Sequence, residues 1–205
     1  MAKTEQLVLL ENQPDGPARF TAPMVLPGDE DRSVGAIVMN CNPFTLGHRY
    51  LVEYAAAQCD VLHLFVVEED RSMFSSQVRL RLVREGTAHL PNVRVHPSGH
   101  YMISSATFPT YFLKQEEDAT AMQCALDCTV FAQCIAPPLH IRTRFVGQEP
   151  LDPVTAQYNA AMAALLPRHG VQVREIPRLE VDGQPVSASR VRRLLKEKGL
   201  CPEVL

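Results

Sequence analysis

The stretch from Val34 to Glu53 constrains the fold more than any other part of this sequence. It begins with an apolar run, 34–40, that is typical of a buried strand. Pro43 stiffens the turn that follows, and Thr45 stands where a helix N-cap is expected. Apolar residues then recur at helical spacing, which predicts a helix with one face on a sheet: Leu51, Val52, Ala55 and Ala56. A strand that runs directly into a helix is the unit from which parallel sheets are built.

The turn between this strand and helix has the features of an anion-binding site. The first N–H groups of a helix have no partner within the helix, and they attract phosphate. Gly47 has no Cβ, so a ligand can approach the backbone there, and His48 lies on the same side of the helix start as Thr45. On its own, Thr-x-Gly-His would be only a cap followed by an exposed residue. The flanking strand and helix, and partner motifs later in the chain, favour a binding role.

The alternation of strands and helices continues along the chain. Further apolar runs predict strands at 61–67, 93–96, 142–147 and 171–176, with helical patterns between them. The fold class is therefore α/β, with a five-stranded parallel sheet covered by helices on both faces, in a catalytic domain spanning 34–205. Residues 1–33 are rich in proline and glycine, and we expect an extended arm or linker there, apart from a short strand at 7–10.

A second polar motif opens the last predicted helix, 186–196. Ser187 and Ser189 lie at its start, and at 100° per residue Ser189, Arg192, Arg193 and Lys196 fall on one stripe. An amphipathic helix with a solvated basic face would look the same. The two hydroxyls beside a guanidinium and free N–H groups favour a polyphosphate site.

Other residues are candidates for contacts with a ligand. Gly147 ends a predicted parallel strand, where a nucleotide can lie across the sheet edge. The irregular segment 97–114 is rich in hydroxyls and aromatics, as pocket linings often are, and contains Ser104, Thr107 and Lys114. Glu149 and Asp152 have either a ligand-orienting role or a capping role.

Composition excludes several function classes. The net charge of −3 gives no reason to expect nucleic acid or a membrane as partner, and no apolar run approaches the ~18 residues of a membrane helix. The N-terminus lacks a signal pattern and the six cysteines form no C-x-x-C pair, so we expect a cytoplasmic protein with reduced thiols. The sequence contains no G-x4-G-K-[ST] loop and no activated serine or cysteine nucleophile.

Asn42-Pro43-Phe44-Thr45-Leu46-Gly47-His48 resembles the (His/Thr)-x-Gly-His signature of the nucleotidyltransferase superfamily, and Ser187, Ser189 and Arg192 align with its second signature. Three segments are similar to the citrate lyase ligase family: the residues around the first motif, Ser104 to Lys114, and Val146 to Asn159. This resemblance covers roughly residues 34–198 and implies a Rossmann-like nucleotidyltransferase fold. Full-length ligases also carry an acetyltransferase-like domain, which residues 1–33 are too short to supply.

The resemblance implies ATP-dependent activation of acetate to acetyl-adenylate, release of pyrophosphate, and acetylation of the prosthetic-group thiol of the citrate lyase acyl carrier subunit. It implies a nucleotide site made of Asn42, Phe44, Thr45, Gly47, His48, Gly147, Ser187, Ser189 and Arg192. Thr45, His48 and Arg192 would stabilise charge on the phosphates. Mg²⁺ would bridge phosphate oxygens with few protein ligands.

Two other functions stay open from the sequence. Met73-Phe74 followed by Arg79 resembles phosphopantetheine adenylyltransferase, which makes Arg79 a candidate substrate contact or a structural residue. By that resemblance, the chain could instead be an adenylyltransferase that acts on a phosphate monoester such as phosphopantetheine. Thr45 in place of the commoner histidine also allows a nucleotide-binding regulator without catalysis.

Overall fold

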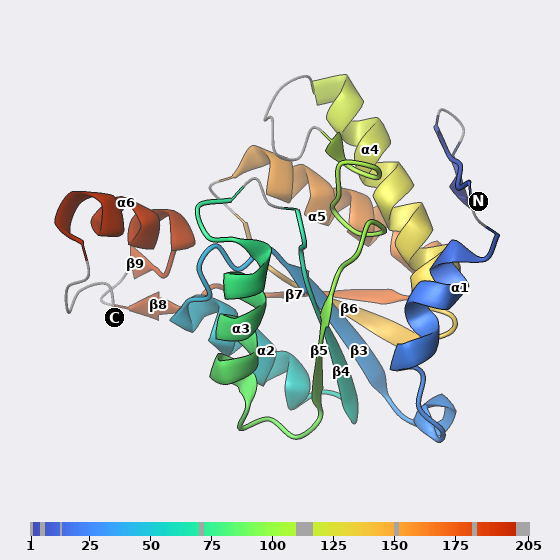
Figure 1. Ribbon diagram of the computed structural model, residues 1–205, viewed down its shortest axis with the longest axis horizontal. Helices are drawn as coiled ribbons and strands as arrows, with labels where there is room; N and C mark the ends of the chain where they lie inside the picture. The colour runs from blue at the N-terminus through green and yellow to red at the C-terminus, as the bar shows by residue number, and fades with distance from the viewer. Residues whose placement is uncertain are drawn as a thin grey trace.

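Five parallel strands form the central sheet of the computed structural model, which describes residues 2–4, 7–12, 14–69, 72–109, 117–149, 152–181 and 184–199 (Figure 1). The order across the sheet is β5-β4-β3-β6-β7. The strands are β3 (Val34–Met39), β4 (Val61–Val66), β5 (Val93–Pro97), β6 (Ile141–Gly147) and β7 (Gln172–Ile176). The chain runs outward from β3 to β5, then returns to the other side of β3 as β6. The carboxyl ends of β3 and β6 therefore form the switch point at which such sheets bind ligands.

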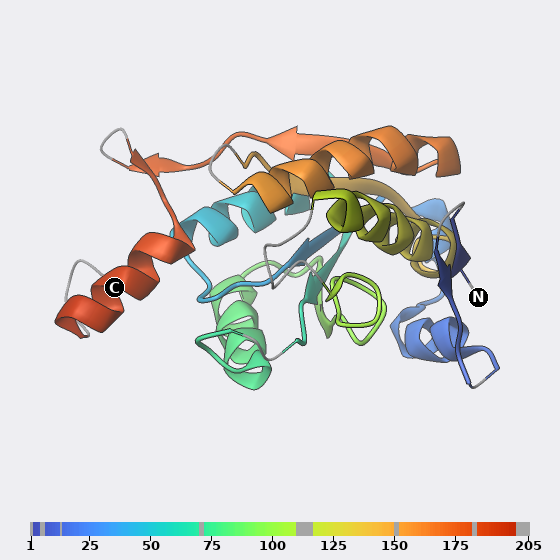
Figure 2. The ribbon, with the colours of Figure 1, turned by 90° about the horizontal axis from the view of Figure 1, so that it is seen from above.

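The period-2 alternation of each strand separates two apolar cores. Ile37 of β3 and Leu64 of β4 face α2 (Leu46–Ala56) and α3 (Ser76–Thr87). Ala36 and Phe65 face α4 (Glu117–Val130) and α5 (Pro153–Leu165), which lie side by side in Figure 2. Burial on both faces explains the nearly continuous apolar character of β3 and β4. The predicted α/β, Rossmann-like class and its five parallel strands are confirmed.

The helix starts follow from capping residues in the sequence. The side chains of Thr45, Ser75 and Asp152 cap α2, α3 and α5, and Pro153 occupies the first turn of α5, where its missing N–H costs nothing. The helical pattern expected between the third and fourth strands consists of α4 and a π-helical turn, η4 (Phe131–Ile135). A short 3-10 turn, η5 (Leu166–His169), follows α5.

The N-terminal residues differ from the extended arm expected from their composition. They form a small hairpin, β1 (Ala2–Lys3) with β2 (Val8–Leu9), then α1 (Gly16–Thr21) and two 3-10 turns, η1 (Ala22–Met24) and η2 (Asp29–Asp31). Proline is compatible with a first helical turn, so the Gly-Pro pair that reads as a linker begins α1 instead. Ala2 packs on α4, and buried Asp29 pairs with Arg94 of β5. The boundary at residue 34 stays a proposal.

The C-terminal helix has no fully buried residue. A hairpin of β8 (Glu180–Val181) and β9 (Gln184–Pro185), which the sequence did not predict, leads to α6 (Ala188–Lys198). In Figure 1, α6 stands at one end of the molecule beyond α2 and α3. Its apolar side chains are only half-buried: Val191, Leu194 and Leu195. Among the residues that the structure describes, no helix is long and apolar enough to span a membrane.

Candidate functional site

A cavity of about 480 Å³ opens at the carboxyl ends of β3 and β6. It contains most of the sequence-predicted nucleotide residues from both signature motifs and from the end of β6: Asn42, Thr45, Gly47, His48, Gly147, Ser187, Ser189 and Arg192. These residues come from distant parts of the chain: Arg192, which donates to the carbonyl of Asn42, lies 150 positions after it. The parallel topology brings the starts of α2 and α6 to one edge of the sheet, as the pairing of the two motifs predicted.

Thr45 and His48 close a reciprocal cap at the start of α2. The Thr45 backbone N–H donates to His48 Nδ1 at 3.1 Å, and the His48 N–H donates to Thr45 Oγ1 at 3.5 Å. Because Nδ1 accepts from that N–H, it carries no proton, so the Thr45 hydroxyl, 2.8 Å away, donates to it. Nδ1 is then an acceptor twice over, which assigns the proton of the neutral ring to Nε2. His48 thus offers an Nε2–H donor from a fixed ring.

The electrostatic surroundings keep His48 neutral. Desolvation, followed by the charges of Arg178 and Arg192, lowers its pKa to about 4. Phe44 stacks on the imidazole with 5.9 Å between ring centroids, and Phe44 in turn lies against Gly86 of α3, where a Cβ would meet its ring at 2.4 Å. Phe44 does not line the cavity itself; it supports the ring that does.

Arg192 connects the two motifs. One terminal nitrogen donates to the carbonyl of Asn42, and the other donates to Ser189 Oγ at 2.9 Å. Gly47 lies against the backbone of Val186, whose carbonyl oxygen would be 3.4 Å from a Cβ at position 47. That is an ordinary van der Waals distance, so the packing of Val186 on the start of α2 does not itself require glycine at position 47.

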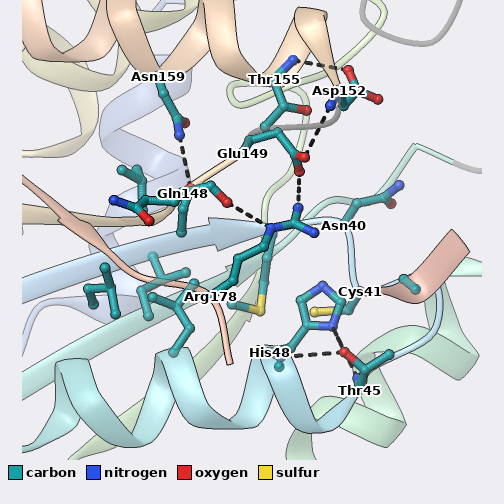
Figure 3. Close-up of a pocket in the computed structure, with 18 of the residues that line it drawn as sticks. Asn40, Cys41, Thr45, His48, Gln148, Glu149, Asp152, Thr155, Asn159 and Arg178 are labelled. Carbon is teal, nitrogen blue, oxygen red and sulfur yellow. Dashed lines mark hydrogen bonds and ion pairs between the residues drawn. The ribbon is translucent and has the colours of Figure 1, made fainter. Parts of the chain in front are cut away.

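The opposite wall of the cavity carries charged groups that the sequence did not single out together. Arg178, in the loop after β7, donates to the Gln148 carbonyl at 2.8 Å and forms an ion pair with Glu149. In Figure 3 the guanidinium of Arg178 lies above the ring of His48 and is directed toward Gln148 and Glu149. Arg178 was missed because no motif surrounds it; the signal was its place just after a parallel strand, at the same sheet edge. Asp152 accepts from two N–H groups of α5, so its capping role is realised.

Three of the candidates for contacts with substrate do not line the cavity: Arg79, Ser104 and Thr107. Arg79 is fully buried and donates to the carbonyls of Phe74, Asn40, Val67 and Glu69, which fixes the loops after β3 and β4. Ser104 and Thr107 are buried; Ser104 Oγ donates to the His100 carbonyl at 2.7 Å, and Thr107 Oγ1 donates to Asp127 at 2.6 Å. Lys114 lies outside the described residues.

The described residues include no group of three or more His, Cys, Asp or Glu side chains that could hold a metal ion. The carboxylates at the cavity are already engaged, Glu149 with Arg178 and Asp152 with α5. The donor set therefore does not fit a dedicated metal site. The open end of the cavity offers a ligand N–H groups, the neutral imidazole of His48 and the guanidinium groups of Arg178 and Arg192, all of which suit an extended anion.

Known proteins resemble this chain in sequence and in structure. A solved structure of NadR protein in complex with NAD and AMP-PNP is 17% identical, covers 82% of this chain and 43% of that chain, and has a TM-score of 0.49. The [citrate [pro-3S]-lyase] ligase of Klebsiella pneumoniae is 46% identical over 95% of this chain and 58% of the relative; that of Escherichia coli (strain K12) is 44% identical over 95% and 56%. The chain thus spans rather more than half the length of these curated relatives. The family model of the citrate lyase ligase C-terminal domain matches residues 34–202, and the chain belongs to this family.

Proposed function

We propose that this chain activates acetate with ATP, forming acetyl-adenylate and pyrophosphate, and then acetylates the prosthetic-group thiol of the citrate lyase acyl carrier subunit. The proposal rests on its family, whose curated relatives are named as ligases of citrate lyase. The single observation that carries it is the meeting of two helix starts, His48 and Arg192 in one cavity at the switch point. A cytoplasmic location is part of the proposal.

In the first step an acetate oxygen attacks the α-phosphorus of ATP, and the bond from that phosphorus to the bridging oxygen of pyrophosphate breaks. The electron pair of that bond leaves with pyrophosphate. His48 Nε2–H donates to a phosphate oxygen at the start of α2. Ser187, Ser189, Arg192 and the free N–H groups of α6 hold the pyrophosphate end. In the second step the carrier's thiolate attacks the acyl carbon, and AMP leaves.

Catalysis of this kind needs positioning and charge neutralisation and no protein nucleophile. Holding two reactants in the correct geometry contributes about 7–11 kcal/mol to lowering a barrier. The ring of His48, fixed at Nδ1 by Thr45 and stacked on Phe44, is prepositioned before the nucleotide arrives. Mg²⁺ enters this proposal bound to the phosphate oxygens of ATP.

The adenylyltransferase alternative gains nothing from the structure. Its motivating residue, Arg79, lies away from the cavity lining with its guanidinium donating to backbone carbonyls. Because Arg79 holds backbone carbonyls and does not line the cavity, it no longer supports the adenylyltransferase, and only the ligase is proposed.

The test is exchange of labelled pyrophosphate into ATP by the purified chain, with and without acetate, together with trapping by hydroxylamine. Acetate-dependent exchange and formation of acetohydroxamate support the ligase. Exchange that needs a phosphate monoester and gives no hydroxamate would replace it with the adenylyltransferase. ATP binding in a calorimeter without exchange across a panel of acids would leave a nucleotide-binding regulator.

A further inference from the structure

A third arginine reaches the cavity from within the core. Arg144 lies in the middle of β6, and its side chain points to the face covered by α4 and α5. It is 2% exposed, and its guanidinium carbon lies 4.6 Å from the centroid of the Phe131 ring. It nevertheless lines the cavity, beside Ile103, Tyr158 and Met162. Arg144 is therefore at the buried end of the same cavity whose open end carries His48.

The guanidinium of Arg144 is short of hydrogen-bond acceptors. Within the described part of the chain, its Nε and one terminal nitrogen are buried and have no hydrogen-bond partner. The other large buried arginine, Arg79, shows the usual solution: it donates to backbone carbonyls on all sides. A buried charged group without hydrogen bonds costs several kcal/mol, so such a group in a cavity wall points to an acceptor supplied from outside.

The carboxylate of Asp127, whose charge acts on Arg144, does not supply that acceptor. Asp127 of α4 is fully buried and accepts from the Ile103 N–H at 2.7 Å, Thr107 Oγ1 at 2.6 Å and the Tyr158 hydroxyl at 2.5 Å. The charge of Arg144 acts on Asp127 without a hydrogen bond between them: it lowers the carboxyl's pKa, against the larger effect of burial, which raises it. Asp127 balances the charge of Arg144 but leaves its N–H groups free for a small anion.

The shape and chemistry of this end of the cavity limit the kinds of anion that can bind there. Ile103, Met162 and the ring of Phe131 are apolar, so the end suits a small organic group with one charged terminus. A dianionic phosphate group would lie near the charge of Asp127, and the polyphosphate already has the helix starts at the open end. A planar carboxylate matches the fork of a guanidinium.

We propose that Arg144 binds the carboxylate of a small monocarboxylic acid, and so positions the acid substrate against the nucleotide. This inference rests on the proposed function and deepens it. A carboxylate approaching the phosphates of ATP brings two anions together, and Arg144 offsets that repulsion from the buried side. One carboxylate oxygen accepts from Arg144; an oxygen of the same group forms the new bond to the α-phosphorus as pyrophosphate leaves. Arg144 is thus the specificity-determining residue for the acid.

The experiment measures acetate-dependent exchange of pyrophosphate into ATP for Arg144→Met, with Arg142→Met as the matched control. Arg142 lies two residues earlier on the same strand, is exposed and does not line the cavity. We expect Arg144→Met to raise the KM of acetate at least about tenfold, the cost of one charge-assisted hydrogen bond, while the KM of ATP stays within about twofold of wild type. Arg142→Met should match wild type in both.

Unchanged acetate KM in a folded Arg144→Met protein overturns the inference and leaves the proposed function standing. Wild-type protein that exchanges with no acid in a panel overturns both. If Arg144→Met does not fold, Arg144→Lys keeps the charge but not the fork, and we expect a folded protein with a raised acetate KM. A third measurement needs no variant: propionate should compete with acetate in wild type, whereas acetamide, its neutral analogue, should not. Equal competition by acetamide would also overturn the inference.

Discussion

Replacing His48 separates its structural role from its catalytic one. The imidazole does two things in the structure: Nδ1 accepts from the Thr45 N–H, and Nε2–H faces the cavity. Losing the cap acceptor in His48→Ala should cost about 0.5–1 kcal/mol of folding free energy, or a fall in Tm of roughly 1–4 °C for a chain of this size. Losing a donor to the phosphates should cost about 10²–10³ in kcat, which is about 2.7–4 kcal/mol of transition-state stabilisation.

Two further substitutions make the test sharp. Glutamine at the fourth residue of a capping box accepts from the N-cap N–H, so His48→Gln should keep the wild-type Tm yet still lose most of the kcat. Glutamate would cap equally well but place a negative charge beside the phosphates, so His48→Glu should be folded and the least active of the three. Thermal melts and pyrophosphate exchange on the same samples measure both quantities. Near-wild-type kcat in folded His48→Gln would refute the catalytic role.

Three other outcomes follow from the structure. Arg192→Ala should raise the KM of ATP about tenfold or more and change Tm little, because α6 has no fully buried residue; an unchanged ATP KM would place the pyrophosphate elsewhere. Arg79→Met should lower the urea-unfolding free energy by about 3 kcal/mol or more, since it leaves buried carbonyls without their donor; wild-type stability would contradict this account of Arg79. Burial lowers the pKa of His63 to about 3 and of His96 to about 4, below their unfolded value of 6.5. The unfolded chain then binds more protons between pH 6.5 and 4, so stability should fall as pH falls through that window, and it should fall less in His96→Gln; denaturant melts at several pH values check this.

The sheet was predictable because its signals are local. The apolar runs of β3 and β4 reflect burial on both faces, and Thr45, Ser75 and Pro153 mark helix starts with side chains that act within one turn. The meeting of the two motifs was also predictable, since parallel strands share one carboxyl edge. The family resemblance added the choice of the proposed nucleotide residues, which periodicity alone does not give.

The roles of individual arginines could not be predicted from the sequence, because they depend on contacts between residues far apart in the chain. Arg79 in α3 and Arg144 in β6 are both arginines in amphipathic or apolar segments, and nothing local shows that one donates to carbonyls while the other lacks acceptors. Arg178 becomes part of the site only through Gln148 and Glu149, about thirty residues earlier. The N-terminal helix α1 was missed because proline and glycine are compatible with both a linker and a short helix start.

The fate of isotopic oxygen tests the central proposal most directly. The purified chain would be given acetate labelled with ¹⁸O in both oxygens, together with ATP and a thiol acceptor, and the AMP and residual acetate would be analysed by mass spectrometry. If an acetate oxygen attacks the α-phosphorus in this cavity, each turnover must leave one ¹⁸O in the phosphate of AMP, and His48→Gln must slow its appearance in proportion to kcat. Unlabelled AMP, or label found in inorganic phosphate with ADP as the other product, would contradict attack at the α-phosphorus.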